Sequence, residues 1–486
     1  MTKPYRFLPF RFERKDNKVL LVNDVGDYCF LDKDQFHKFI KMDEEFVRQS
    51  EDFINLQSKF MLSSDCLSQT LDLLSTRYRT KKQFLYDFTS LHMFVVTQRC
   101  NLKCAYCHAS SVDEACGKDY DMSVHTAHKC VNLALSSPSK HIKIEFQGGE
   151  PLLNFDTVKE IVEYAKEANK IRNKHLEFVI CTNLTIIDEH QIDYLKQNNI
   201  CVSTSLDGPL DIHDKCRRTR VGSGTYSTIK EKLSCVMEIM GHDKVSSLVT
   251  VTSFSVDRLR EVVDEYIQLG LSSIFLRAIN PYGRASKYWK NLGYTIEEFV
   301  VNYKLVLDYI IHLNLSGIYF TEEFATLLLT RILTPFPTGF VDLQSPTGAG
   351  IGGVIYETNG DVYIADEARM LSKMNGNKIF CLGNVHSHSW EAIFCCDKLK
   401  GIIEESCIEA TPGCAWCVYQ TYCGSDPVRN YIQFGNISGH GMRSDFCRKH
   451  RSIFNILFGY LQQNNDNIED VFWSWISSRR LSEISI

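Results

Sequence analysis

Three closely spaced cysteines are the residues of this chain best suited to chemistry. Cys100, Cys104 and Cys107 stand in the stretch VTQRCNLKCAYCHAS and follow the pattern C-x3-C-x2-C. Three thiolates can hold three corners of a cubane iron–sulfur cluster and leave one iron without a protein ligand. Such an iron can bind an external molecule, as the open position of a catalytic zinc site does. The alternative is a structural zinc site, but it would need a fourth ligand nearby, and the adjacent His108 is awkwardly spaced for that role.

The composition limits the classes of function. A chain of 486 residues is too long for one hydrophobic core, so two or three domains are expected. The formal net charge of −5 gives no general reason to bind nucleic acid or an anionic membrane. We find no secretory signal and no apolar run near the roughly 18 residues of a membrane span, so we expect a cytoplasmic protein. In a reducing compartment, 19 cysteines indicate metal ligation or catalysis rather than disulfides.

The elements that must position these cysteines follow a repeating pattern. From residue 91 on, short apolar runs typical of buried strands alternate with stretches whose apolar residues recur every three or four positions. Successive β/α units indicate a parallel sheet that curls into an incomplete barrel, with its chemistry at the carboxyl ends of the strands. We therefore predict an α/β fold with a partial (β/α)6 TIM-like barrel, whose strands are 92–97, 142–146, 177–181, 201–205, 247–253 and 273–277.

The chain is expected to have four regions. The first, an α+β extension, is either a small peptide-binding or winged-helix-like module or a segment that only packs on the next domain. The last begins with a glycine-punctuated β-hairpin, whose strands lie near 352–357 and 361–365, and is rich in cysteine. The predicted regions are the extension 1–90, the barrel core 91–295, a helical bridge 296–344 and the cysteine-rich domain 345–486.

The cysteine loop resembles the signature of radical S-adenosylmethionine (SAM) enzymes. Tyr106 supplies the aromatic residue before the third cysteine, GGEP (148–151) ends the second strand and SLDGP (205–209) ends the fourth. The resemblance covers about residues 91–290. It implies a [4Fe–4S] cluster whose open iron chelates SAM. It also implies that an electron from an external reductant cleaves SAM to a 5′-deoxyadenosyl radical, which abstracts a hydrogen atom from the substrate.

The same resemblance assigns roles to individual residues. The GGEP segment contacts the SAM amino group, because glycine lets the backbone approach a ligand closely. Tyr106 lies by the adenine, polar contacts come from the end of the fourth strand, and two arginines are candidates for the SAM carboxylate. The implied cofactor-binding residues are Tyr106, Gly148, Gly149, Glu150, Pro151, Ser205, Asp207, Arg217 and Arg277.

A second group of cysteines lies near the C-terminus. Cys414, Cys417 and Cys423 follow the pattern C-x2-C-x5-C, and Cys447 comes after them. Four thiolates would complete the coordination of one [4Fe–4S] cluster for electron transfer or structure. A zinc site is the alternative, because C-x2-C spacing does not separate zinc from iron. The group resembles the SPASM extension of radical SAM peptide maturases, which carries auxiliary clusters.

This chain departs from the full SPASM pattern. Three positions expected to hold cysteine contain Thr347, Ala365 and Pro427. Loss of a whole ligand set predicts that the first auxiliary cluster is absent and that one auxiliary [4Fe–4S] cluster remains. Alternatively, other cysteines replace the lost ligands; otherwise they are ordinary thiols. The candidates are Cys381, Cys395, Cys396 and Cys407.

One candidate proton acceptor follows a lost cysteine. In relatives that modify sulfatases, an Asp in this slot serves as a base, and here the slot holds Asp366. A carboxylate near a carbon-centred radical could take the proton released when that radical is oxidised or forms a bond. The alternative is a solvated turn residue, and Glu367 is a weaker candidate for the same role.

The N-terminal stretch LPFRFERKDNKVLLVNDVGDYCFLDKDQF, ahead of a radical SAM/SPASM body, resembles one maturase of the His-Xaa-Ser system. This implies a ribosomally made precursor peptide with His-Xaa-Ser repeats, a second radical SAM maturase as a partner, and a crosslink or oxidation as the product. Two alternatives stay open: a radical SAM enzyme acting on a small molecule or tRNA, and a non-catalytic iron–sulfur electron carrier. The one modestly basic run, CRKHR at 447–451, makes tRNA less favoured. A sulfatase-type maturase would need the full auxiliary set.

Overall fold

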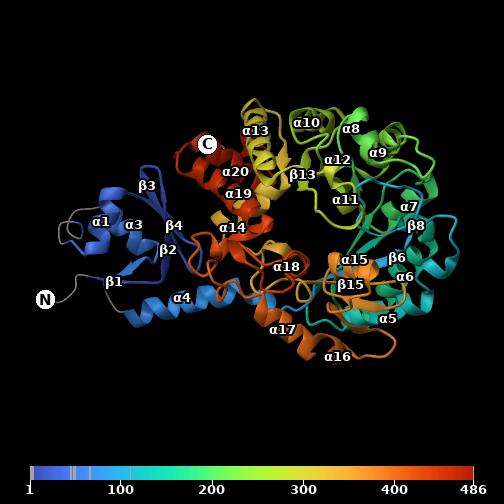
Figure 1. Cartoon of the computed structure of the whole chain (residues 1–486), viewed down its shortest axis with the longest axis horizontal. Helices are drawn as coiled ribbons and strands as arrows, with labels where there is room; N and C mark the ends of the chain where they lie inside the picture. The colour runs from blue at the N-terminus through green and yellow to red at the C-terminus, as the bar shows by residue number, and fades with distance from the viewer. Residues whose placement is uncertain (1–4, 44–45, 47–50, 65–66, 110, 485–486) are drawn as a thin grey trace. The chain divides into compact units, whose positions relative to one another are not determined.

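The computed structural model describes residues 5–43, 46, 51–64, 67–109 and 111–484. Contacts within the chain divide it into two compact units, which are described separately. The sheet unit comprises residues 87–326, 349–402 and 466–486, and the auxiliary unit comprises residues 1–86, 327–348 and 403–465. Each unit is therefore assembled from three separate stretches of sequence (Figure 1).

The sheet unit is built on a ten-stranded sheet in which eight neighbouring strands are parallel, seven of them from the predicted barrel region and its continuation and the eighth from the hairpin described below. The order β6-β9-β10-β11-β12-β13-β14 follows the chain, and the two strands between β6 and β9 along the chain, β7 (Arg99–Cys100) and β8 (Val112–Asp113), pair with each other in a separate small sheet. The predicted partial barrel of α/β type is confirmed, and all six predicted strands are present. The seven strands of the barrel region and its continuation are β6 (Leu91–Thr97), β9 (His141–Gly148), β10 (His175–Cys181), β11 (Ile200–Ser205), β12 (Val245–Val251), β13 (Ser273–Ala278) and β14 (Thr321–Glu322).

Helices connect these strands, and the longer ones bury an apolar stripe. In α6 (Phe155–Arg172) the buried residues Val158, Ile161, Val162 and Ala165 recur at three- and four-residue spacing. Ser123 caps α5 by accepting a hydrogen bond from the Thr126 N–H. The connecting helices are α5 (Val124–Leu135), α6, α7 (Glu189–Gln197), α8 (Leu210–Cys216), α9 (Tyr226–Met240) and α10 (Leu259–Gln268), followed by α11 (Gly283–Lys287), α12 (Trp289–Leu292) and α13 (Ile296–Leu315). The next helix, α14 (Glu323–Leu333), begins in the sheet unit and belongs to the auxiliary unit from residue 327 on.

The predicted glycine-punctuated hairpin is present, and it extends the same sheet. β15 (Gly353–Tyr356) pairs parallel with β6, while β16 (Asp361–Tyr363) pairs antiparallel with β15 and β17 (Cys381–Asn384) with β16. The pairing with β6 brings α15 (Asp366–Asn375), which follows β16, to the strand that precedes the cysteine loop. The domain boundaries proposed from the sequence remain a prediction.

In the auxiliary unit, the N-terminal segment forms an antiparallel sheet of β2 (Phe10–Lys15), β3 (Lys18–Asn23) and β4 (Tyr28–Asp32). Val19, Leu21, Phe36, Phe39 and Leu56 belong to its core. The strand β2 is not predicted from the sequence, because four of its six residues are charged. Its helices are α1 (Lys33–Lys41), α3 (Glu51–Ser58) and α4 (Leu67–Lys81).

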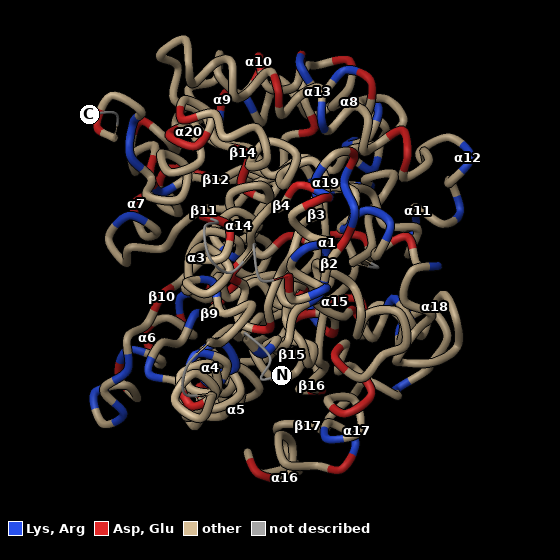
Figure 2. The backbone as a smooth tube through the Cα atoms, turned by 90° about the vertical axis from the view of Figure 1, so that its left-hand side faces the viewer, with Lys and Arg blue, Asp and Glu red and all other residues tan. Residues whose placement is uncertain are grey.

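The remaining elements are short or lie toward the C-terminus. In the auxiliary unit they include β1 (Arg6–Phe7), β5 (Leu62–Ser63), α18 (Pro427–Phe434) and α19 (Asp445–Leu461). In the sheet unit they include β7 (Arg99–Cys100), β8 (Val112–Asp113), α16 (Trp390–Phe394) and α20 (Asp466–Ser477), and α17 (Asp397–Glu405) spans the boundary at residue 402. Among the described residues, no helix has the length and apolarity needed to cross a membrane. Figure 2 shows Lys and Arg interspersed with Asp and Glu along the backbone.

A buried carboxyl group ties β13 to the start of α14. Glu322 is fully buried and accepts hydrogen bonds from the Tyr303 hydroxyl, from the Leu276 N–H at 3.1 Å and from the Ala325 N–H at 2.6 Å. Burial raises the pKa of Glu322 to about 7, although these hydrogen bonds oppose the shift. The folded state therefore favours the protonated acid, whereas the unfolded chain ionises near the ordinary value of 4.5.

We expect Glu322 to make the stability of the sheet unit depend on pH. Its stabilising contribution is complete below about pH 4.5 and is lost as the pH rises through about 7, a change of about 3 kcal/mol in the free energy of unfolding. Urea unfolding of the wild type and of Glu322→Gln at pH 5 and pH 8 measures the contribution of this side chain. The free energy of unfolding of the wild type relative to that of the variant should be smaller at pH 8 than at pH 5, and an equal difference between the two proteins at both pH values would contradict the prediction.

Candidate active site at the carboxyl ends of the strands

The cysteine loop begins where β6 ends. Cys100 is buried in β7, and Cys104 and Cys107 share a turn in which the Cys107 N–H donates to the Cys104 carbonyl at 3.3 Å. Burial, Glu150 and the thiols of Cys104 and Cys107 together raise the pKa of the Cys100 thiol to about 12, although a backbone hydrogen bond opposes the shift. The three thiols therefore lie near enough to interact, and binding a cationic centre would offset the repulsion between their thiolates.

The spacing of the thiols differs from that of a single-ion site. Within the part of the chain that the structure describes, no three Cys, His, Asp or Glu side chains converge closely enough to hold one metal ion. A [4Fe–4S] cluster binds each cysteine to a different iron, so its ligand sulfur atoms lie farther apart than those around one ion. The groups around the thiols therefore decide whether the loop fits such a cluster and its ligand.

The two glycines of GGEP allow a close approach to this loop. Gly148 has a φ of +153°, and a Cβ on it would lie 2.1 Å from the Thr97 carbonyl oxygen; a Cβ on Gly149 would lie 2.1 Å from that of Arg99. Any side chain at these positions would push the end of β9 away from the end of β6. Glycine is therefore required here for the backbone to lie against the cysteine loop.

The Glu150 side chain makes hydrogen bonds inside the protein. Its carboxylate accepts hydrogen bonds from the Thr182 hydroxyl at 2.6 Å and the Asn183 N–H at 2.8 Å, and it is almost fully buried. The side chain thus fastens the end of β9 to the loop after β10. Pro151 follows as the first residue of a short 3-10 turn (Pro151–Asn154). A contact of Glu150 with SAM stays a prediction.

Tyr106, Asp207 and Arg217 form one buried network. The Tyr106 hydroxyl donates to the Asp207 carboxylate at 2.6 Å, and the Arg217 Nη1 donates to the Tyr106 oxygen at 2.9 Å. Asp207 also accepts a hydrogen bond from the Thr250 N–H at 3.2 Å, which fixes it to the end of β12. Three of the residues inferred from the sequence are therefore brought together, and half-buried Ser205 ends β11 just before them.

Two arginines near this network have unsatisfied nitrogen atoms. The Arg217 Nε and the Arg284 Nη1 are buried and have no hydrogen-bond partner among the residues that the structure describes. The Arg284 N–H donates to the Cys107 carbonyl at 3.1 Å, and the charges of Arg217 and Arg284 oppose the effect of burial, which raises the pKa of Cys104 to about 11. Buried donors without partners indicate a missing acceptor. Three thiols, a glycine cradle and two such arginines fit a [4Fe–4S] cluster with SAM, whose carboxylate would supply the acceptor.

The sequence analysis named Arg277 instead of Arg284. Arg277 is 42% exposed and lies 3.6 Å from the Glu367 carboxylate. A signal for Arg284 was available, because it stands in NPYGRA directly after the last full strand of the barrel. The turn after β13 returns it to the cysteine loop, and Gly283, at a φ of +54°, leaves no room there for a side chain beside His108.

Asp366 belongs to a buried ionic network at the start of α15. Its carboxylate lies 2.8 Å from the His108 Nε2 and accepts a hydrogen bond from the Arg369 Nε at 2.8 Å. Arg369 also contacts Glu357 at 3.1 Å. Burial alone would raise the pKa of Asp366, but the charges of Arg369 and His108 hold it well below its usual range. Asp366 is therefore ionised and directed at the residue that follows Cys107.

The second group of cysteines lies in the auxiliary unit. Burial and the thiols of Cys447 and Cys417 raise the pKa of Cys414 to about 11. Burial also raises the pKa of Cys423, and the thiols of Cys417, Cys447 and Cys414 add to that shift. The four thiols are thus mutual neighbours, as the ligands of one cluster must be.

The other cysteines of the C-terminal region are divided between the two units. Cys381, Cys395 and Cys396 belong to the sheet unit, and Cys407 belongs to the auxiliary unit. Cys395 is exposed, and the Cys381 thiol is half-buried in β17. The idea that one of them ligates a further cluster stays a prediction. The loss of the first auxiliary cluster, whose expected cysteine ligands are Thr347, Ala365 and Pro427 in this chain, also stays a prediction.

Comparisons with known proteins place this site in a family. Residues 94–266 match the Radical SAM superfamily. An uncharacterized protein of Methanocaldococcus jannaschii is 31% identical over 262 residues, which are 49% of this chain and 83% of that protein. The cysteine-type anaerobic sulfatase-maturating enzyme of Clostridium perfringens (strain ATCC 13124) is 26% identical over 384 residues, which are 76% of this chain and 96% of that enzyme.

Solved structures share the fold. Native anSMEcpe with bound AdoMet and the Cp18Cys peptide has a TM-score of 0.63 at 22% identity, covering 78% of this chain and 99% of that one. Streptococcus suis SuiB bound to the precursor peptide SuiA has a TM-score of 0.55 at 15% identity, covering 91% of this chain and all of that one. This chain belongs to the radical SAM superfamily and is related to its peptide- and protein-modifying maturases.

Proposed function

We propose that this radical SAM enzyme modifies a ribosomally made peptide, by a crosslink or an oxidation, and that the peptide carries His-Xaa-Ser repeats. The observation that carries the proposal is the meeting of three thiols with two arginines whose buried nitrogens lack partners. The relatedness to a sulfatase-maturating enzyme supports a polypeptide substrate. The precursor-bound structure of SuiB supports a precursor peptide in the same fold. A second radical SAM maturase, an external one-electron reductant and a cytoplasmic location complete the proposal.

Each group of residues at the site has a proposed ligand. Cys100, Cys104 and Cys107 would hold the [4Fe–4S] cluster, which with SAM supplies a 5′-deoxyadenosyl radical when both are bound. Arg217 and Arg284 would bind the SAM carboxylate through their unpaired nitrogens. The four cysteines 414, 417, 423 and 447 would hold one auxiliary [4Fe–4S] cluster. Residues 1–90 would grip the peptide.

Asp366 would accept the proton that leaves the peptide after hydrogen abstraction. Asp366 is ionised, and Arg369 and His108 hold its oxygens in place. Because the same two cations lower its pKa, it would take a proton only from a strongly acidic group such as the oxidised substrate. An oxidation that forms a new double bond or crosslink removes two hydrogens from the peptide. One leaves as a hydrogen atom to the 5′-deoxyadenosyl radical, and the other leaves as a proton and as an electron that the cluster held by cysteines 414, 417, 423 and 447 would accept. The carboxylate has the charge and the fixed orientation that the proton transfer needs.

The proposal is tested with anaerobically reconstituted enzyme, SAM, dithionite and a synthetic peptide with His-Xaa-Ser repeats. We expect 5′-deoxyadenosine and a peptide that has lost the mass of two hydrogens. An absence of 5′-deoxyadenosine with or without peptide would favour the electron carrier. Its formation with an unmodified peptide would refute this peptide substrate and leave the small-molecule and tRNA alternatives.

Asp366→Asn should separate hydrogen abstraction from product formation. We expect a loss of about 100-fold or more in product, because a positioned general base contributes on that scale. Transfer of deuterium from a labelled peptide to 5′-deoxyadenosine should continue. Glu367→Gln is the matched control and should keep product formation. If the Asp366 variant lost deuterium transfer as well, the side chain would be needed for binding or folding and not as a proton acceptor.

A further inference from the structure

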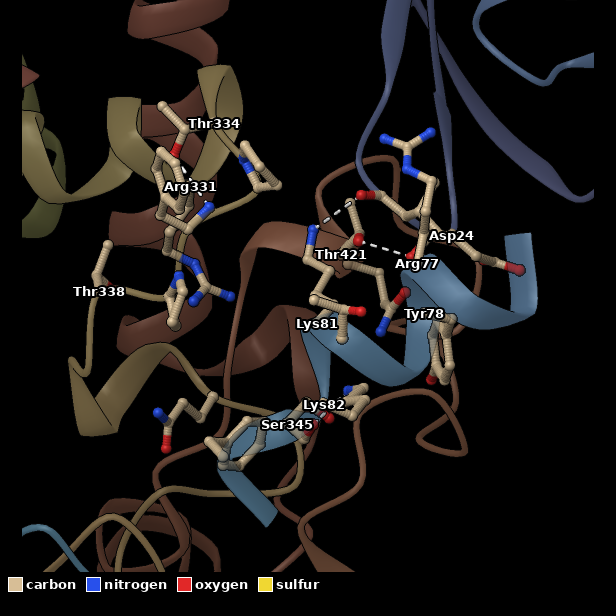
Figure 3. Close-up of a pocket in the computed structure, with 18 of the residues that line it drawn as sticks. Asp24, Arg77, Tyr78, Lys81, Lys82, Arg331, Thr334, Thr338, Ser345 and Thr421 are labelled. Atoms are coloured by element: carbon tan, nitrogen blue, oxygen red, sulfur yellow. Dashed lines mark hydrogen bonds between the residues drawn. The ribbon is translucent and has the colours of Figure 1, made fainter. Parts of the chain in front are cut away.

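The auxiliary unit contains a pocket that the proposed chemistry does not use. It has a volume of about 160 Å³ and is lined by the last turns of α4, by the segment that follows α14 and by the backbone around Ser345 and Thr421. Figure 3 shows Lys81 on α4 and Arg331 on α14 on opposite walls of the pocket. A cavity of this size is comparable to one that holds a benzene molecule, so it takes about six heavy atoms.

The acidic groups of this pocket are already neutralised. Its two lining carboxylates are each paired with a basic side chain, and one of its lining arginines is paired with a carboxylate outside it. The lining therefore leaves no unpaired carboxylate for the remaining cations, and Cys423 is the other lining group whose charge would attract Arg331. The ion pairs are Arg11–Asp24 at 2.6 Å, Lys82–Glu409 at 2.5 Å and Arg77–Asp27 at 2.6 Å.

Lys81 and Arg331 are the two cations left over. Among the described residues, no carboxylate forms an ion pair with either of them. Among the described residues, the Lys81 Nζ donates one weak hydrogen bond, to the Val25 carbonyl at 3.4 Å, and lies 5.3 Å from the centre of the Tyr422 ring. The Arg331 Nε donates to the Tyr422 carbonyl at 2.9 Å. Most of the donor capacity of an ammonium and a guanidinium group is therefore unused.

The positive charges of Lys81 and Arg331 also repel each other. Burial and the charge of Arg331 lower the pKa of Lys81 to about 7. Like charges in a half-buried site repel one another strongly, because the surrounding dielectric constant is well below that of water. An acidic oxygen pair between them would remove that repulsion and use the free donors.

We infer that this pocket binds a carboxylate of a peptide, held between the Lys81 ammonium and the Arg331 guanidinium. The inference rests on the proposed peptide substrate and names a part of the chain that would hold it. A peptide residue is favoured over inorganic phosphate because the rim is apolar. Phe336, between Pro335 and Pro337, is 67% exposed beside the pocket and can cover the methylene groups of a side chain.

The first test measures binding of a defined probe to the reconstituted full-length protein. The probe is the tetrapeptide fluorescein-Gly-Gly-Phe-Glu with an amidated C-terminus, compared with the same peptide ending in Gln and with one ending in Gln and a free carboxylate. We expect binding of the two acids and at least a tenfold loss for the amidated Gln peptide, since hydrogen bonds between charged groups are worth that much. Equal binding of all three would overturn the inference.

Variants locate the site. Lys81→Gln and Arg331→Gln should each weaken binding of the Glu peptide about tenfold or more, whereas Arg79→Gln, an exposed arginine of α4 outside the pocket, should not change it. A second measurement needs no variant: the Glu peptide should slow acetylation of Lys81 by an amine-reactive ester, followed by mass spectrometry. Undiminished acetylation of Lys81 at saturating peptide would overturn the inference.

Two further outcomes would show that Lys81 and Arg331 have a role other than binding a peptide carboxylate. If inorganic phosphate protects Lys81 and the peptides do not, the pocket binds a free anion. If neither binds, but both variants shift the midpoint potential of the auxiliary cluster, the cations only offset its charge, since Cys423 also lines the pocket. Formation of 5′-deoxyadenosine and peptide product is followed in parallel, so that failure of this inference is distinct from failure of the proposed function.

Discussion

Replacement of Cys100, Cys104 and Cys107 together with alanine should lower the iron content of the reconstituted protein from about eight atoms per chain to about four. The reason lies in the separation of the two thiol groups along the chain and into different units: one group follows β6, and the other lies in the auxiliary unit. Each group interacts within itself, as the mutual effects on the thiol pKa values show. The variant should also form no 5′-deoxyadenosine.

Two control proteins make this result specific. A variant with Cys116, Cys201 and Cys235 changed to alanine loses three half-buried thiols of the same unit and should keep its iron. A variant with the four cysteines 414, 417, 423 and 447 changed should lose the complementary four irons. About twelve irons in the wild type would mean that further cysteines build another cluster. Zinc at the second group would remove the auxiliary cluster, and iron near zero in every protein would contradict the radical SAM chemistry altogether.

The fold could be predicted from the sequence because each strand carries its own local signal. The runs at β9 and β11 bury alternate residues, and α6 buries residues at helical spacing, so the pattern of apolar residues alone locates them. The same local signal fails at β2, where charged residues occupy a strand whose neighbours supply the core. It also cannot show that β15 pairs with β6, because strand partners are set by the packing of the whole sheet.

The site could be predicted only as far as motifs reach. The cysteine spacing, GGEP and SLDGP point to strand ends, and the structure brings Tyr106, Asp207 and Arg217 together there. What a motif cannot give is the direction of a side chain after a turn. Glu150 turns toward Thr182, inside the protein.

The arginines provide the second large expected effect. Arg284→Gln should weaken SAM binding tenfold to a hundredfold, the usual value of hydrogen bonds to a charged group, because its Nη1 is buried without a partner. Arg277→Gln is the matched control, since that side chain is 42% exposed and faces Glu367, and its effect should stay within about twofold. Binding is measured by equilibrium dialysis on protein with unchanged iron content, and by the shift of the reduced cluster's electron paramagnetic resonance spectrum when SAM is added.

Arg217 needs a substitution that keeps its positive charge, because Asp207 is fully buried. The Tyr106 hydroxyl lies between the two, donating to Asp207 and accepting from Arg217. Removal of the charge would leave a carboxylate uncompensated and destabilise the barrel as well as the site. Arg217→Lys keeps the charge but loses the fork of donors that matches a carboxylate. It should therefore weaken SAM binding while the free energy of unfolding changes little. If Arg277→Gln weakened binding as strongly as Arg284→Gln, the assignment from the sequence would be right and the unpaired nitrogen of Arg284 would serve another ligand.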